Sequence, residues 1–222
     1  MNQLQRDLER QAKQFAGETA DVLNGTVTDG IRLDCGLYTL GSHGQAIVTY
    51  KLDRINRRGE SIPLKISRTP AKLSLRVFHA LRMDDESRHL ANIKSTYGLY
   101  VQHKSAFAYH YERDADNNYP AAHLHIDGKA KRLQGILDVV GRGKDKPTAL
   151  HLPVGGRRYR PSLEDIIEFC IVERLVDARD GWQQRLSQSR ERFHEQQLRA
   201  AVRDKPSVAA EALMSLGWTV HE

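Results

Sequence analysis

The stretch Pro120-Ala-Ala-His-Leu-His-Ile-Asp-Gly128 decides how the middle of this chain folds. Its residues alternate between an apolar and an ionisable set, Ala122, Leu124 and Ile126 against His123, His125 and Asp127. Alternation with a period of two is typical of a β-strand that packs one face on the core and exposes the other. We therefore expect both histidines on one face of a sheet, roughly 7 Å apart.

The chain on either side of this stretch shows further β patterns. Alternating or apolar runs predict strands at residues 31–40, 45–52, 62–66, 72–82, 89–102, 105–113 and 149–153. The connections between them are short and rich in turn residues, as in residues 41–44. Several strands with short connections favour an antiparallel sheet over βαβ units.

Helical patterns are confined to the two ends of the chain. Apolar residues recur every three or four positions over residues 2–23, 162–176, 181–205 and 207–216. The sequence thus predicts an α+β fold with an N-terminal helix, a mostly antiparallel β-sheet and a C-terminal helical subdomain. We place residues 1–160 in the domain of helix and sheet, and residues 161–222 in the subdomain packed on it.

Composition indicates a globular protein of the cytoplasm. The chain has 222 residues, which is long enough for one domain with an attached subdomain. Its residues are 40% hydrophobic and 28% charged, as in a globular protein. We find no apolar run of membrane-spanning length and no signal peptide, so we expect no membrane contact. Cys35 and Cys170 are far apart and are expected to be reduced core residues.

Positive charge is concentrated in residues 128–160. This segment holds nine basic and two acidic side chains, a net charge of +7, whereas the whole chain carries +6. A concentrated basic segment is the electrostatic footprint of a polyanion such as RNA, although it is also common in solvated loops.

The histidines can support metal-free acid–base chemistry. Histidine transfers protons at neutral pH, and nearby cations stabilise the charge that develops during phosphodiester cleavage. His123 and His125 are the candidate acid–base pair, with Tyr111 and Arg113 of the neighbouring strand as further catalytic candidates. The sequence leaves open whether the protein is an enzyme, and favours ribonuclease-like cleavage without a cofactor.

A divalent metal such as zinc is the alternative use of the same strand. Zinc takes three or four nitrogen, sulfur or oxygen ligands. His123 and His125 offer two, and a third has to come from Asp127, His151 or His110 through the fold. A metal-dependent hydrolase is therefore a second hypothesis.

A phosphate-binding turn is predicted at Gly155-Gly-Arg-Arg-Tyr-Arg160, immediately before the helix that starts near Ser162. Glycines expose backbone N–H groups, a helix N-terminus attracts anions, and arginines bind phosphate through two hydrogen bonds. The candidate phosphate-binding residues are Arg157, Arg158, Arg160, Lys129 and Arg132. A non-catalytic nucleic-acid-binding module that uses residues 128–160 is a third hypothesis.

Residues 105–176 resemble the TumE-like toxin family of bacterial toxin–antitoxin modules. The resemblance rests on the order Tyr-His-Tyr-Glu-Arg113, Asp114-Ala-Asp-Asn-Asn118, Pro120-Ala-Ala-His-Leu-His125 and a helix beginning Ser162-Leu-Glu-Asp165. It implies an intracellular toxin that acts on RNA and is neutralised by an antitoxin-like protein partner, with His123 and His125 as the functional positions. Ala121 and Ala122 stand where the family tends to have another histidine. The oligomeric state stays open, with a dimer as one option.

Overall fold

The computed structural model of the chain describes residues 2–40, 43–67, 73–113, 120–127, 134, 137–139, 143–147, 152–155 and 160–221. Its helices are α1 (Gln3–Asn24), α3 (Leu163–Val172), α4 (Trp182–Asp204) and α5 (Pro206–Ser215). Its strands are β1 (Asp34–Leu40), β2 (His43–Asp53), β3 (Arg58–Glu60), β4 (Ile62–Pro63), β5 (Leu73–Met83), β6 (Leu90–Val101), β7 (Lys104–Glu112), β8 (Ala122–Ile126) and β9 (Leu152–Pro153).

The strands form one antiparallel sheet in the order β1-β2-β5-β6-β7-β8-β9, with β3 paired to β2 and β4 to β5. The predicted α+β fold is therefore confirmed, including its N-terminal helix, antiparallel sheet and C-terminal helices. The histidine strand is β8, which lies between β7 and the two-residue strand β9. The register of β8 with β9 pairs His123 with Pro153 and Leu124 with Leu152.

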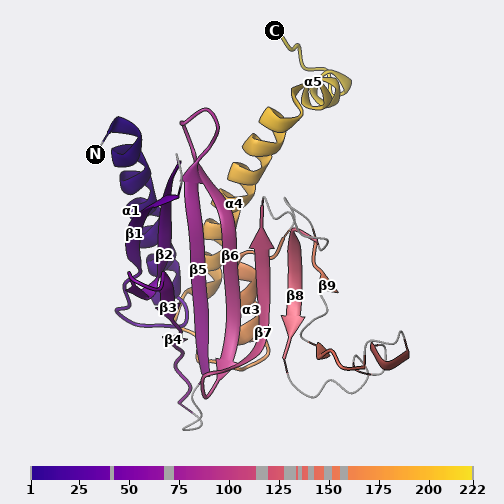
Figure 1. Cartoon of the computed structure of the whole chain (residues 1–222). Coiled ribbons are helices and arrows are strands. Elements are labelled where there is room, and N and C mark those ends of the chain that lie inside the picture. The colour runs from indigo at the N-terminus through magenta and orange to yellow at the C-terminus, as the bar shows by residue number, and fades with distance from the viewer. Residues whose placement is uncertain are drawn as a thin grey trace.

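The helices α1, α3 and α4 cover one face of the sheet (Figure 1). One buried cluster joins α3 and α4 to strands β5 and β6 through Ile167, Leu186, Leu75, Val77 and Leu99. A second cluster joins α1 to the sheet through Leu8, Ala12, Val48 and Leu81. Removal of these apolar side chains from water supplies the main driving force for this packing.

Side-chain caps fix where α1 and α3 begin. Asn2 accepts a hydrogen bond from the backbone N–H of Gln5, and the Gln5 side chain accepts one from the backbone N–H of Asn2. Ser162 and Asp165 make the same reciprocal pair at the start of α3, where the sequence predicts that a helix begins. Such caps satisfy backbone donors that have no partner within the helix.

We call the other side of the sheet the open face, because none of the described helices packs on it (Figure 1). The far end of α4 and all of α5 project beyond the sheet, and α5 buries none of its residues. Among the described residues no helix is both long and apolar enough to cross a membrane. Both cysteines are free, Cys170 being buried and Cys35 half-buried.

Candidate functional site

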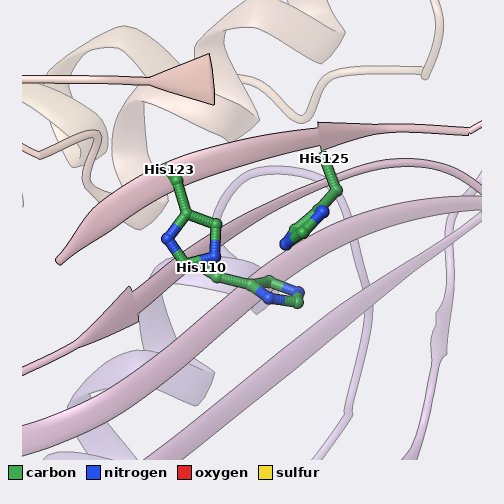
Figure 2. A group of neighbouring side chains, drawn as sticks. All are labelled: His110, His123 and His125. Carbon is green, nitrogen blue, oxygen red and sulfur yellow. The ribbon is translucent and has the colours of Figure 1, made fainter. Parts of the chain in front are cut away.

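Three histidines meet on the open face of the sheet. The register of β7 and β8 places His110 directly opposite His123, and His125 lies two residues further along β8. Directly opposed residues of antiparallel strands project to the same face, as do residues two apart on one strand. Figure 2 shows the three imidazole rings gathered on one side of the two strands.

The rings are close enough to share one ligand. Their centroids are separated by 5.6 Å for His110 and His123, 4.7 Å for His110 and His125, and 4.9 Å for His123 and His125. One ring nitrogen of each lies within 4.8 Å of the corresponding nitrogens of the other two. Zinc–nitrogen distances are about 2.0–2.1 Å, so the rings would move closer together on binding one zinc ion.

His123 is held in one orientation by its surroundings. It is 1% exposed, and its Nδ1 lies 2.8 Å from the backbone oxygen of Pro120. A carbonyl oxygen only accepts, so Nδ1 carries the proton and donates it. In a neutral ring this leaves Nε2 as the nitrogen with a lone pair. This arrangement is usual for a histidine that binds a metal through its other nitrogen.

His110 is kept neutral by its environment. The pKa of His110 is lowered to about 4, mainly by burial and then, in decreasing order, by the neighbouring His125, His123 and Lys94, against an opposing effect of Glu112. A neutral imidazole is the form that binds a metal, whereas a protonated ring has no lone pair to offer. His110 is therefore in its ligand form across the physiological pH range.

The fold thus selects the third member of the cluster. Among the described residues, the group able to hold a metal consists of His110, His123 and His125. Asp127 is exposed beyond the end of β8 and is not part of that group. His151 lies outside the described residues, so the sequence-based suggestion of that ligand remains a prediction.

Tyr111, Arg113 and Arg160 lie on the other side of the sheet. Side chains alternate along β7, so Tyr111 points to the helix-covered face, where it is buried. The Arg160 guanidinium lies 4.0 Å from the centre of the Tyr111 ring. With Arg113 these residues line a cleft of about 670 Å³ between α1, α4 and the sheet. The sheet lies between them and the histidines of β8, so the catalytic roles of Tyr111 and Arg113 and the phosphate-binding role of Arg160 remain predictions.

The same cleft contains two residues that the sequence analysis assigned to no site. The pKa of His79 is lowered to about 3, mainly by burial and then by the positive charge of Arg160. Burial also raises the pKa of Tyr97, whose hydroxyl lies 3.4 Å from Nε2 of His79. His79 shares its strand face with leucines and valine, a pattern that indicates only a core position.

The other predicted phosphate-binding residues, Lys129, Arg132, Arg157 and Arg158, lie outside the described residues. Their roles remain predictions. Arg160 alone of this set is described, and it lies in the cleft on the helix-covered face.

Comparison of the chain with protein-family models, with curated proteins and with solved structures finds no match. Function therefore has to be inferred from the geometry of the site.

Proposed function

We propose that His110, His123 and His125 bind a divalent metal ion, zinc by preference, and that the protein is a metal-dependent hydrolase. The observation that carries this proposal is the convergence of three imidazole nitrogens within 4.8 Å on one face of the sheet. Three histidines without cysteine suit zinc, and leave a fourth coordination position for water or substrate. Structural zinc sites, by contrast, usually supply four protein ligands.

The chemistry that such a centre supplies is hydrolysis. Zinc held by three neutral ligands acts as a Lewis acid and activates water near neutral pH. The backbone oxygen of Pro120 would orient His123 by accepting a hydrogen bond from its Nδ1–H, which also increases the basicity of Nε2. The lowered pKa of His110 would keep its nitrogen available for the metal.

A phosphodiester, with RNA as the leading substrate, fits the charge of the chain. The segment of net charge +7 begins directly after β8 and contains β9, which pairs with His123. A segment of this charge attracts a polyanion such as RNA. The resemblance to TumE-like toxins supports the same substrate, and would add an antitoxin-like protein as partner.

Metal-free cleavage by His123 and His125 as an acid–base pair is the second candidate. Their rings are 4.9 Å apart on the same face, which is close enough for both to contact one substrate. General acid–base catalysis requires proton-transfer distances of about 2.6–3.2 Å to substrate, directly or through one water. The two candidates differ in whether a chelator abolishes activity.

The decisive experiment measures metal content and RNA cleavage on the same preparations. Purified protein is loaded with Zn²⁺, desalted and analysed by mass spectrometry of the metal, then incubated with end-labelled RNA with and without EDTA. We expect about one zinc per chain in the parent protein, and a zinc content more than tenfold lower in His110→Ala and His125→Ala. The matched control is His194→Ala, because His194 is exposed on α4.

Each outcome selects one candidate. Zinc binding that depends on His110 and His125, with cleavage that EDTA abolishes, supports the metal-dependent hydrolase. Cleavage that survives EDTA but is lost in His123→Gln supports the acid–base pair. Equal zinc content in the control and the site variants would refute the metal centre.

A further inference from the structure

The open face carries two copies of the same short motif. Gly36-Leu-Tyr38 lies on β1 and Gly98-Leu-Tyr100 lies on β6. The register from strand to strand places both tyrosines on the face that holds His110, while the two leucines point to the helix-covered core. The two copies therefore share their orientation in the sheet as well as their sequence.

In the second copy, the tyrosine ring lies against its own glycine. A Cβ added to Gly98 would meet Cε2 of Tyr100 at 2.8 Å, so the absence of a side chain makes room for the ring. The Arg76 guanidinium lies 4.9 Å from the centre of that ring. Arg76 is paired with Gly98 across the strands, which brings the guanidinium over the ring.

The first copy repeats this arrangement. A Cβ on Gly36 would lie 3.0 Å from the Tyr38 hydroxyl, which shows that this ring also extends back over its glycine. The Arg57 guanidinium lies 4.8 Å from the centre of the Tyr38 ring. The open face thus presents two arginine–tyrosine stacks. They are three strands apart in the sheet, roughly 14 Å laterally, and the register offsets the two tyrosines by roughly 26 Å along the strands.

The two stacked arginines differ from the other cations of this face in their pairing. Lys94 is bound to Glu112 at 2.6 Å, and Arg82 lies 3.7 Å from Asp85. Among the described residues, neither Arg57 nor Arg76 has a carboxylate oxygen within 4.0 Å. Their positive charges are therefore available to an anionic ligand, which is complementary in charge to this part of the face.

Each stack also contains a buried polar atom without a hydrogen-bond partner among the described residues, namely the hydroxyl oxygen of Tyr38 and Nε of Arg76. Buried polar atoms without partners are rare in native proteins and call for an explanation such as water or a ligand.

The second stack is aligned with the histidine cluster. Arg76, Gly98, Ala108 and His125 are register partners across four neighbouring strands. Arg76 and His125 are thus roughly 14 Å apart across the sheet, with only the short side chains of glycine and alanine between them in that row. A ligand that extends from the stack across this row reaches the three histidines.

We propose that the open face binds a single-stranded nucleic acid, with Arg57 and Arg76 contacting phosphates and bases stacking on the two arginine–tyrosine pairs. Single strands are bound by surfaces that combine cations with planar groups, because every base has a face to stack. Binding itself does not need the metal. Only cleavage of the bound strand at the histidines rests on the proposed function.

The test measures binding in EDTA, where a metal-dependent cleavage cannot interfere. Fluorescence anisotropy of a labelled RNA of about 12 nucleotides, a length within usual single-strand site sizes, gives the Kd of the full chain. We expect Arg57→Gln and Arg76→Gln each to weaken binding about tenfold and to lower the salt dependence by about one counterion. The matched control is Arg199→Gln, which removes an exposed charge from α4, with an expected change below about twofold.

The outcomes separate this surface from the metal centre. RNA binding that is absent, or equally weakened by all three substitutions, overturns the proposal. A duplex of the same sequence that binds as tightly as the single strand also overturns it, because paired bases cannot stack on the face. Zinc content is measured in parallel and is expected to be unchanged in Arg76→Gln. If zinc binding fails while these effects on RNA remain, only the proposed metal centre is refuted.

Discussion

His79 should make the protein sensitive to acid in a way that one substitution can isolate. The ring is buried against Phe15 of α1, at a centroid distance of 4.7 Å, and burial lowers its pKa from 6.5 to about 3. Below pH 6.5 the unfolded chain binds a proton at this position, but the folded protein does so only near pH 3. The stabilising contribution is therefore complete above pH 6.5 and is lost as the pH falls.

The magnitude follows from the linkage between proton binding and folding. Each pH unit between the two pKa values lowers the free energy of unfolding by about 1.4 kcal/mol. Between pH 6.5 and pH 4.5 His79 should thus cost roughly 2 to 3 kcal/mol, a large part of the usual stability of a domain.

The assay compares the parent protein with His79→Gln, a polar residue that does not titrate. Free energies of unfolding are measured by urea denaturation at pH 6.5 and pH 4.5 in EDTA, so that metal binding does not contribute. We expect the loss between the two pH values to be about 2 kcal/mol smaller in His79→Gln than in the parent. His194→Gln, on the exposed surface of α4, is the control. An identical pH dependence in parent and variant would refute the reasoning.

Three further predictions concern the metal centre, the open face and the start of α3. Zn²⁺ at 100 times its Kd should raise the free energy of unfolding by about 2.7 kcal/mol, and calorimetry should show no such increase in His125→Ala. Gly98→Ala would force the Tyr100 ring away from Arg76, so anisotropy should show about fivefold weaker RNA binding, with zinc content unchanged. Ser162→Ala removes the side-chain acceptor for the backbone N–H of Asp165 and should cost about 1 kcal/mol in urea denaturation at neutral pH.

Much of the fold could be predicted from local sequence. The alternation in residues 72–82, 105–113 and 120–128 is also the alternation of faces in β5, β7 and β8. The helix expected from Ser162 onward does begin there, as α3, because its cap is made by residues only three positions apart. These predictions succeed because the side-chain period of a strand and the cap of a helix are properties of short segments.

The membership of the histidine cluster depended on the tertiary structure. The sequence determined that His123 and His125 share one face of their strand, and that His110 and Tyr111 occupy opposite faces of theirs. It did not determine how the two strands align. The pairing of His110 with His123 made His110 the third member, and the same pairing placed Tyr111 on the far side of the sheet with Arg160. Because side chains alternate along a strand, a shift of β8 by one residue would have moved its histidines to the helix-covered face. The register is set by contacts between distant segments, which local sequence patterns do not contain.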